Sequence, residues 1–437
     1  MRFALIETRG KKFAVNKDQA GSFGTSTDAG NGLFSKLLNK IKRNGVRTPV
    51  MSMAYMHSIL KQEGHDVEFF EKKPNGEFDI IIIASSIVDY KNELALANEI
   101  KKTSNAKIGF TGAFAQVKPD IFLKVADFIL TGEPEEATYR LARGEIEPSG
   151  IIVSKLISDL DSLPFPEWHN RNLDQYNYYP LLKNKPLISV QGSRGCSYDC
   201  TYCPYMVTQT PNWRKRSPKN LVDEIEFLIN EFGIKSIVFR DPLFTHDMYR
   251  IKKLCAEIIE RKLNFEWSCE TRVDRLSEPL LDIMYAAGLR GIEFGVEAFD
   301  LKLLSSMHRT PPTHELQEKI VNYCENLGVK MMAFYVLGLP GQTKDDILET
   351  IDYSKHLNTS LAQFTLATPF PGTKFIEEIK SSINDNGTFE NYSHFQPLIN
   401  SEHYTPDELL KLKEKAFKEY YVRRKWIRKR ALKILIN

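Results

Sequence analysis

The sequence has few cysteines, and none of them lies in the first 195 residues. Six occur in 437 residues, and three of these, Cys196, Cys200 and Cys203, fall within eight positions. A secreted disulfide framework distributes its cysteines along a much shorter chain. We therefore expect a reducing compartment, the cytoplasm, and a shared local role for the three clustered thiols.

Long apolar runs and a strong net charge are also missing. No stretch reaches the roughly 18 apolar residues of a membrane-spanning helix, and the start MRFALIETRGKKF lacks the apolar core of a signal peptide. The formal net charge is +3, which gives no reason to expect nucleic-acid binding. The chain is long enough, and with 42% hydrophobic residues apolar enough, for two or three folded domains.

Residues 1–145 alternate strand patterns with helical patterns. Five strands are expected, at Arg2–Glu7, Asp66–Glu71, Asp79–Ser85, Lys107–Thr111 and Phe128–Thr131. The run Ile80–Ile83 is apolar on both faces, as a central parallel strand should be. This order predicts a doubly wound, Rossmann-like parallel sheet in an α/β fold.

The long connection after the first strand contains a predicted helix that Gly45 can end. Its apolar residues fall on one face: Leu33, Phe34, Leu37, Leu38 and Ile41. Residues 146–185, by contrast, contain LPFPEW and NYYP and show no helical or strand period, so they are predicted to be a linker.

Residues 186–375 repeat a strand–helix unit six times. The expected strands are Pro186–Gln191, Ser236–Arg240, Phe265–Glu270, Gly291–Val296, Lys330–Leu337 and Ala362–Ala367. Six units are too few for the eight-unit barrel and predict a partial (β/α)6 barrel. Residues 376–437 are predicted to be a helical region, with Thr405 as N-cap of one long helix that runs into a basic tail.

The cysteine loop has the spacing CxxxCxxC, with Tyr202 before the last cysteine. Thiolates suit iron–sulfur clusters, and three of them on one loop can hold three irons of a 4Fe–4S cube while leaving the fourth iron open. A structural zinc site is the alternative, but it needs a fourth ligand. Cys255, Cys269 and Cys324 are expected to be core residues.

The CxxxCxxC loop at the head of a six-unit βα domain resembles the radical S-adenosylmethionine (SAM) superfamily. The resemblance implies a 4Fe–4S cluster on Cys196, Cys200 and Cys203, with SAM bound to the open iron. It also implies an electron donor such as a flavodoxin or ferredoxin, and a 5′-deoxyadenosyl radical that removes a hydrogen atom from the substrate.

The same resemblance places SAM contacts at the ends of successive strands, where ligands of parallel sheets bind. The residues in question are Tyr202, Asp241, Glu270, Arg272, Glu297 and Gly338. Asp241 would accept from the SAM amino group, Arg272 would pair with its carboxylate, and Glu297 would contact the ribose or amino group. Gly338 falls in the adenine segment. Each residue taken alone is equally compatible with an ordinary strand-end side chain.

The N-terminal region lacks three other signals. It has no cysteine for a second cluster, as in the tRNA methylthiotransferases, no GxGxxG after the first strand, and no DxHxxG histidine for cobalt. The arrangement resembles the cobalamin-binding radical SAM enzymes, which implies a corrin near small residues at three strand ends. These are Ser85, Ser86, Thr111, Gly112, Gly132 and Glu133. A sheet that binds no corrin is the alternative.

The resemblance implies a cobalamin-dependent methyltransferase that acts on an unactivated carbon or a phosphorus centre of a small-molecule or lipid-like substrate. Cyclisation, rearrangement or oxidation with the same cofactors, a corrin-free radical SAM enzyme and a non-catalytic metal scaffold remain open. No catalytic side chain is singled out. The basic tail, with Arg423, Lys425 and Lys433 among apolar residues, is compatible with contact to an anionic membrane or with simple packing.

Overall fold

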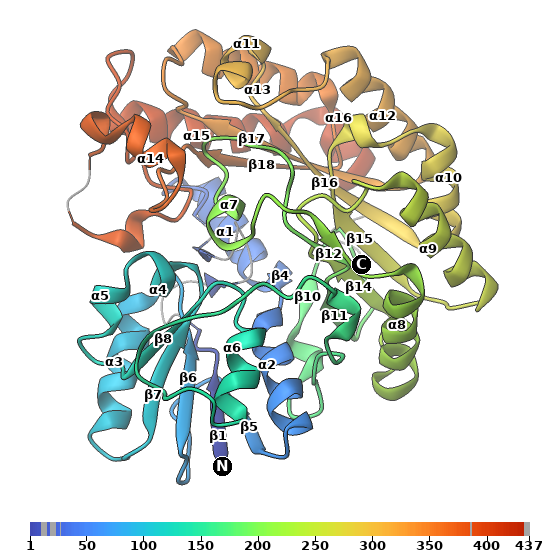
Figure 1. Ribbon diagram of the computed structural model, residues 1–437. Coiled ribbons are helices and arrows are strands. Elements are labelled where there is room, and N and C mark those ends of the chain that lie inside the picture. The colour runs from blue at the N-terminus through green and yellow to red at the C-terminus, as the bar shows by residue number, and fades with distance from the viewer. Residues whose placement is uncertain (10–14, 18–22, 27, 385–386, 432–437) are drawn as a thin grey trace.

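The computed structural model describes residues 1–9, 15–17, 23–26, 28–384 and 387–431. Two six-stranded parallel sheets form the frame of the molecule, one in each half of the chain (Figure 1). This confirms the predicted α/β class and both parallel sheets.

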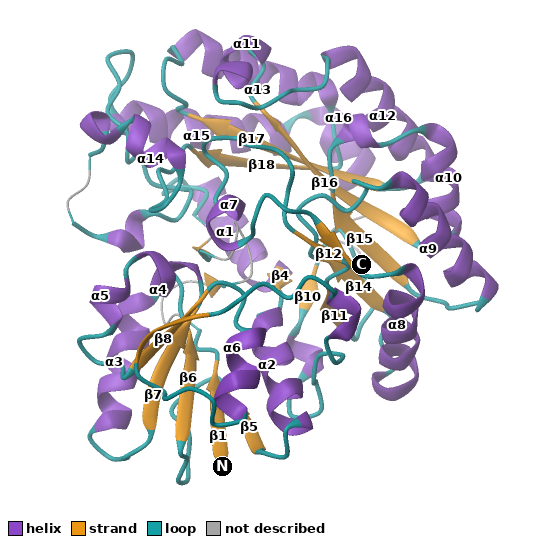
Figure 2. Cartoon of the chain, viewed as in Figure 1, coloured by secondary structure: helices purple, strands orange, loops and turns teal. Residues whose placement is uncertain are grey.

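The first sheet has the order β5-β1-β6-β7-β8-β9. Its strands are β1 (Arg2–Ile6), β5 (Asp66–Phe70), β6 (Ile80–Ala84), β7 (Lys107–Thr111), β8 (Phe128–Thr131) and β9 (Gly150–Val153). The helices around it are α2 (Met51–Gln62), α3 (Tyr90–Lys101), α4 (Ala113–Val117), α5 (Pro119–Phe122) and α6 (Glu135–Ala142). All of β6 is buried, which explains its continuous apolar run. The arrowheads in Figure 2 show that the carboxyl ends of this sheet point toward the second half of the molecule.

Strand β9 corrects the predicted linker. The sequence predicts no strand in the range 146–185, yet residues 150–153 pair in parallel with β8 and form the edge of the first sheet. The strand escapes prediction because it is short and two of its apolar side chains, Ile151 and Val153, are exposed. The rest of this range contains two 3-10 turns, η1 (Leu160–Ser162) and η2 (Leu173–Gln175), and β10 (Asn177–Tyr178), which pairs with β4 (Val46–Arg47).

The second sheet runs β11-β14-β15-β16-β17-β18 in chain order, as a six-unit partial barrel requires. The strands are β11 (Leu187–Val190), β14 (Ser236–Phe239), β15 (Glu266–Glu270), β16 (Leu289–Glu297), β17 (Lys330–Leu337) and β18 (Leu361–Leu366). All six predicted strands are confirmed.

Helices lie along one side of this curved sheet (Figure 2). They are α8 (Pro218–Phe232), α9 (Met248–Glu260), α10 (Glu278–Ala286), α11 (Leu301–Ser306), α12 (His314–Leu327) and α13 (Lys344–Leu357). Local sequence sets their ends, as α8 shows. The Ser217 hydroxyl accepts the Asn220 N–H, Pro218 opens the first turn, and Gly233 ends the helix in a left-handed conformation.

Some of the remaining elements line the inside of the barrel, and all of them lie in the connections or in the C-terminal part of the chain. They are α1 (Leu33–Gly45), the hairpins β2–β3 (Val15–Asn16, Thr25–Ser26) and β12–β13 (Ser193–Arg194, Arg214–Lys215), α7 (Tyr205–Thr208), η3 (Val273–Arg275), α14 (Lys374–Glu378), η4 (Lys380–Ser382), η5 (Phe389–Asn391) and α15 (Pro406–Val422). The predicted cap is confirmed, since Thr405 and Glu408 form a capping box at the start of α15.

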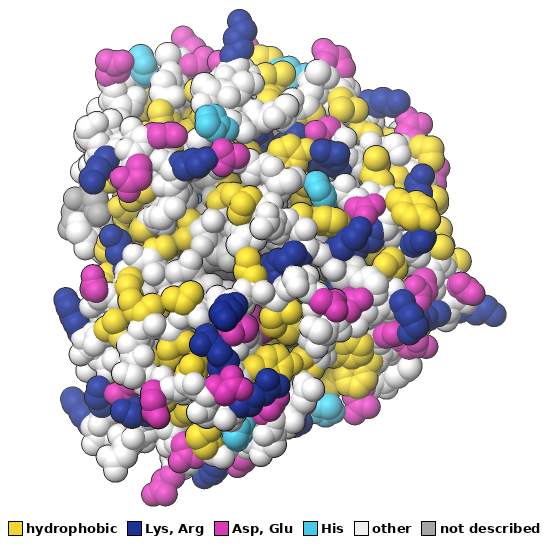
Figure 3. Space-filling model, in the orientation of Figure 1, with side chains coloured by type: hydrophobic (Ala, Val, Ile, Leu, Met, Phe, Trp, Pro, Cys, Tyr) yellow, Lys and Arg dark blue, Asp and Glu magenta, His cyan; other side chains and the backbone are white. Residues whose placement is uncertain are grey.

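The single long C-terminal helix is not confirmed. The chain turns into an extended conformation at Arg423, and α16 (Arg424–Trp426) and a π-helical turn, η6 (Ile427–Ala431), follow. The predicted tail residues beyond position 431, Lys433 among them, lie outside the described residues. None of the described helices combines the length and apolar character that crossing a bilayer requires. On the face drawn in Figure 3, basic and acidic side chains are interspersed, in keeping with the small net charge.

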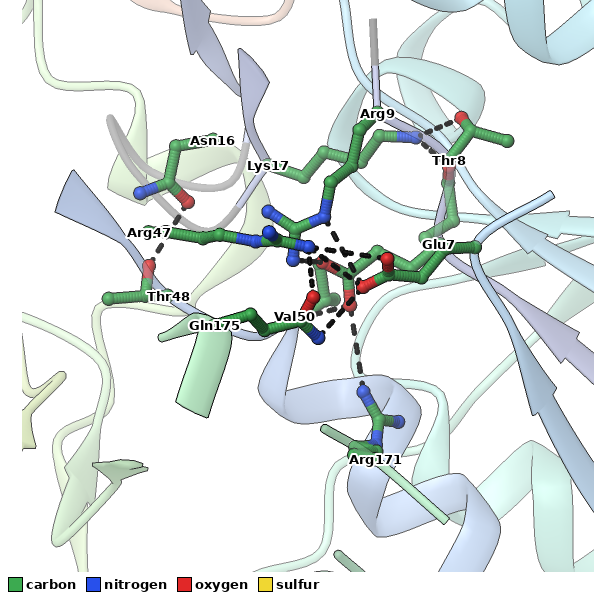
Figure 4. A network of polar contacts seen from close by, with 12 residues as sticks. Glu7, Thr8, Arg9, Asn16, Lys17, Arg47, Thr48, Val50, Arg171 and Gln175 are labelled. Atoms are coloured by element: carbon green, nitrogen blue, oxygen red, sulfur yellow. Dashed lines mark hydrogen bonds and ion pairs between the residues drawn. The ribbon is translucent and has the colours of Figure 1, made fainter. Parts of the chain in front are cut away.

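A polar network joins the end of β1 to the connecting segment (Figure 4). Glu71 accepts from Arg47 Nη2 at 3.1 Å, from Arg9 Nε at 3.3 Å and from Gln175 Nε2 at 2.9 Å. Arg171, whose side chain is fully buried, lies 3.6 Å from Glu7 and stacks on the Phe69 ring. The connector is therefore held against the first sheet and is not a loose tether.

Candidate active site

A cavity of about 550 Å³ lies inside the partial barrel. Strands β14 to β18 contribute its walls, the cysteine loop contributes Cys203 and Tyr202, and α1 and the C-terminal helices line it as well. The barrel helices cover only one side of the sheet, so the other side is left to line this space. The strand ends therefore present their side chains to a common interior.

The cysteine loop follows β11 and is shaped by tight backbone contacts. Gly195 has φ +87°, and a Cβ there would lie 2.4 Å from the Asn212 carbonyl oxygen, so only glycine fits. The Cys203 N–H bonds to the Cys200 carbonyl at 3.1 Å, and the Thr201 N–H bonds to the Met307 carbonyl at 3.1 Å. These bonds fold the loop over the mouth of the barrel.

The three predicted ligands are neighbours. Burial raises the pKa of all three thiols, and the nearby Cys200 and Cys196 thiols raise that of Cys203 further. Among the residues that the structure describes, no three His, Cys, Asp or Glu side chains converge on one metal position. A cube takes its three thiolates on three different irons, so its ligands need not converge, whereas the ligands of a zinc ion must.

Three carboxylates line the cavity at the ends of neighbouring strands: Glu270 on β15, and Glu293 and Glu297 on β16. Burial raises the pKa of Glu270 to about 8 and raises the pKa values of the other two. The positive charge of Arg240 opposes this rise at Glu270 and Glu293. Tyr178 also forms a side-chain hydrogen bond with Glu293.

Glu297 has an unusual backbone. Its φ is +69°, in the left-handed region that side chains other than glycine rarely adopt. Its carboxylate lies 3.2 Å from Arg309 Nη1, and the same arginine donates to the Gly295 carbonyl. Arg309 in turn lowers the pKa of the Cys200 thiol against the dominant effect of burial. The strained turn thus brings a carboxylate and a guanidinium beside the cysteine loop.

This interior suits a cationic ligand that carries hydrogen-bond donors. Burial disfavours the ionised form of all three carboxyl groups despite Arg240 and Arg309, so a bound cation would stabilise their charged forms and find hydrogen-bond acceptors there. The sulfonium and amino groups of SAM provide the matching positive charge and donors. The predicted residues Tyr202, Glu270 and Glu297 are brought together here, beside Cys203.

Three other predicted SAM residues lie elsewhere. Both carboxylate oxygens of Asp241 are used, by the Gly192 N–H at 2.7 Å and the Ser193 hydroxyl at 2.6 Å, so Asp241 braces the start of the cysteine loop. The Arg272 guanidinium is already bonded to both oxygens of Asp274 and stacks on Tyr198.

Gly338 is the third of these residues. It has φ +80°, and a Cβ there would approach Leu409 to 2.8 Å, so it serves the packing of α15. Gln342 fixes this turn by accepting from the Gly338 and Leu339 N–H groups.

Sequence reasoning missed Arg240, Glu293 and Tyr178. Arg240 directly follows β14 and comes just before Asp241, the residue that the motif favoured. The alternation of strand side chains carried a signal for Glu293, since positions 293, 295 and 297 share a face of the strand. Tyr178 comes from the connector, and only the fold brings it to the cavity.

The predicted corrin residues lie at the carboxyl ends of β6, β7 and β8, but several already have other partners. Ser85 Oγ accepts from the Ala115 N–H, and Ser86 Oγ donates to Glu93. Glu133 forms buried ion pairs with Arg194 at 2.8 Å and with Arg214. The structure does not support Glu133 as a corrin contact, because the arginines of the β12–β13 hairpin occupy its carboxylate.

Gly132 leaves bare backbone at this edge, whereas Gly112 packs closely against Ser85. Gly112 has φ +119° and Gly132 has φ +79°, and a Cβ at Gly132 would meet no described atom nearer than the Ser154 carbonyl at 3.4 Å. Thr111 is buried at the end of β7. A flat ligand can approach the backbone at Gly132, so part of this edge fits a macrocycle.

The far side of the cavity is apolar. Met332, Phe334 and Val336 of β17 and Phe395 line it, together with His394. Burial lowers the pKa of His394 to about 4, so its imidazole is neutral at pH 7, and its Nε2 has no hydrogen-bond partner among the described residues. The chamber can therefore receive an uncharged, largely apolar molecule with one polar group.

The fold and the site together define an enzyme that binds an iron–sulfur cluster and SAM in a partial barrel. Residues 190–354 match the sequence profile of the Radical SAM superfamily. These residues make up most of the barrel, and a radical SAM domain implies a 4Fe–4S cluster and SAM.

Relatives extend the likeness beyond the barrel. An uncharacterized methyltransferase of Pyrococcus horikoshii is 26% identical over 87% of this chain and 89% of its own length. Cytidylyl-2-hydroxyethylphosphonate methyltransferase of Streptomyces wedmorensis is 28% identical over 51% of this chain, but the match spans only 44% of that longer protein. The methyltransferase TsrM of Kitasatospora setae, solved with cobalamin and a 4Fe–4S cluster, has a similar fold, with a TM-score of 0.63 at 16% identity over 87% of this chain and 78% of its own.

Proposed function

We propose that this protein is a cobalamin-dependent radical SAM methyltransferase of the cytoplasm, which methylates an unactivated centre of a largely apolar small molecule. The observation that carries the proposal is the continuity of one cavity from Cys203, past three carboxylates, to an apolar chamber. The methyltransferase relatives that match most of the chain support it.

Each part of the cavity has a role in this proposal. The three cysteines hold the cluster, Glu270 and Glu297 receive the SAM amino group and ribose, and Arg240 balances their charge. Bound SAM supplies a 5′-deoxyadenosyl radical after one-electron reduction by a flavodoxin or ferredoxin, and cobalamin supplies the methyl carrier. The apolar walls exclude water, which protects a reactive species from side reactions.

The corrin would lie at the edge of the first sheet that faces the barrel. Gly132 leaves the backbone open there, and Gly112, Thr111, Ser85 and Ser86 stand at the neighbouring strand ends. The cobalt-ligating histidine motif is missing from the sequence, and His57 is buried inside α2.

The test is anaerobic reconstitution with iron, sulfide and hydroxocobalamin, followed by removal of unbound cofactor. We expect the wild type to retain iron, sulfide and corrinoid and to convert SAM to 5′-deoxyadenosine when reduced. Cys200→Ala should lose the cluster and reduce this cleavage to background. Cys255→Ala is the matched control, because Cys255 is buried in α9 away from the loop and should leave both unchanged.

Three outcomes separate the parts of the proposal. Cleavage without retained corrinoid would exclude the cobalamin role while leaving the radical SAM assignment intact. Substrate turnover without transfer of label from methyl-labelled SAM would replace methylation by another radical reaction, such as cyclisation. Absence of any cleavage by the cluster-loaded wild type would contradict the enzymatic assignment.

A further inference from the structure

Helix α1 exposes a stripe of large apolar side chains. Leu33 is 90% exposed, Leu37 57% and Ile41 45%. They follow one another every four residues, so they lie on one face of the helix. Leu38 is buried and Phe34 is half-buried on the side toward the barrel. The helix therefore has an apolar inner side that packs and an apolar outer stripe that nothing in the described structure covers.

This stripe borders the mouth of the active-site cavity. Leu37 and Ile41 line the cavity as well as being exposed, and Tyr421 and Trp426 of the C-terminal helices line it too. Glu414 of α15 holds the start of α1, where its carboxylate accepts from the Asn31 and Gly32 N–H groups. A negative charge at a helix N-terminus is stabilising, so α1 and α15 are joined into one rim.

Positive charge surrounds the apolar rim. Lys36 and Lys40 are exposed on α1, and Arg424, Lys425 and Arg428 are exposed on the segment after α15. Apolar Val422 and Ile427, 47% and 41% exposed, lie among them. Apolar side chains flanked by lysine and arginine are the combination that binds the interface of an anionic bilayer.

We propose that this rim, formed by α1 and the α15–α16 segment, docks on an anionic lipid membrane and that the cavity takes up an apolar lipid chain from it. The uptake of the chain as substrate rests on the proposed function, whereas the docking does not. The lipid chain suits the chamber because its far walls are apolar and because α1 and the α15–α16 segment both line it.

Docking is tested by co-sedimentation of the full chain with vesicles made of equal parts phosphatidylcholine and phosphatidylglycerol, and with vesicles of phosphatidylcholine alone. We expect the wild type to sediment with the anionic vesicles, and less so at high salt. Lys36→Glu/Lys40→Glu and Leu33→Glu should each weaken binding by about tenfold or more. These residues are exposed and do not line the cavity, so circular dichroism and thermal melting should stay as in the wild type.

Matched controls lie on other surfaces. Lys252→Glu reverses an exposed charge on α9, and Val153→Glu replaces a 67% exposed apolar residue on β9. Both should bind vesicles as the wild type does. Failure of the wild type to bind anionic vesicles, or equal losses in the controls, would overturn the docking. A dimer in analytical ultracentrifugation that Leu33→Glu dissociates would overturn it too, and would assign the stripe to a second copy of this chain.

Uptake is tested separately with parinaric acid, a fluorescent fatty acid. Its fluorescence should rise on binding to the wild type, and Val336→Trp, which fills the apolar wall, should reduce that rise without affecting vesicle binding. An unchanged rise in Val336→Trp would overturn the lipid chain as occupant of the cavity. Neither vesicle binding nor parinaric acid fluorescence needs SAM, the cluster or the corrin. A negative result in either measurement can therefore be told apart from a failure of the proposed methyl transfer.

Discussion

At the level of single residues, the site depends on charges held out of water. Glu270, Glu293 and Glu297 share one cavity with Arg240, and burial raises the pKa of each carboxyl. Strand-end position identified Glu270 and Glu297 from the sequence. Motif position favoured Asp241 and Arg272, but local hydrogen bonds direct both side chains to other partners.

The raised carboxyl pKa values give the cofactor-free protein a distinct pH dependence. A carboxyl group whose pKa is higher in the folded protein than in the unfolded chain, where it is near 4.5, binds more protons in the folded state. Its contribution to the free energy of unfolding is therefore complete below about pH 4.5. It is lost as the pH rises through the folded value, about 8 for Glu270. We expect the Glu270 contribution to the free energy of unfolding to fall by about 3 kcal/mol between pH 5 and pH 8.

Urea unfolding followed by circular dichroism at several pH values measures this fall. Glu270→Gln should flatten the profile over this interval, whereas Glu349→Gln, at an exposed position of α13, should reproduce the wild type. A profile that rises toward pH 8 in the wild type would contradict the argument.

At the level of elements, the cysteine loop is tied to the first sheet through a buried ion network. Glu133, which follows β8, pairs with Arg194 and Arg214 of the β12–β13 hairpin, and Glu135 pairs with Arg194 at 2.8 Å. These side chains are at most 10% exposed. Arg194 stands two residues before Cys196, so the network sets the position of the loop relative to the first sheet.

Removing one partner of this network should be costly, because it leaves buried guanidinium groups without their counter-charge. We expect Glu133→Gln to lower the free energy of unfolding by about 3 kcal/mol. Glu63→Gln breaks the more exposed pair with Arg143 and should have a much smaller effect, because solvent screens that pair. Denaturant titration compares the two, and equal small effects would show that the network does not bear on stability.

At the level of the whole molecule, the core of the second sheet extends through the connector to helix α2, which packs beside the first sheet. Tyr55 of α2, Trp168 and Tyr176 of the connector, and Ile188 of β11 belong to a single cluster of buried side chains. The polar network of Figure 4 reinforces the same junction. The connector is therefore part of the core, and the two halves are expected to unfold together.

A core substitution in the connector tests this cooperativity. Trp168→Ala should lower the free energy of unfolding by about 3–5 kcal/mol while preserving a single transition by both circular dichroism and limited proteolysis. Phe227→Ala, at a position that is 37% exposed on α8, should cost much less. Two separate transitions, only one of them shifted by Trp168→Ala, would show that the halves fold independently.

Local sequence was sufficient to predict the two parallel sheets, the six barrel strands and the cysteine loop. The hydrophobic period, the apolar runs and the spacing of the cysteines are local properties, and each can be recognised in a short stretch of sequence. The helix over Leu33–Gly45 can be recognised in the same way, but the side on which it packs cannot. The pattern grouped five apolar residues on one face, yet the packing against the barrel is what buries Leu38 and leaves Leu33 exposed.

Which strand-end side chains share the cavity depends on the tertiary fold. Arg240, Glu293 and Tyr178 come from two strands and the connector, and no sequence spacing relates them. The same is true of Glu133, whose partners are 61 and 81 residues away. Side chains at the ends of parallel strands form hydrogen bonds and ion pairs with whatever groups lie nearby in the fold. The positions of those groups determine which strand-end side chains remain available to bind a ligand.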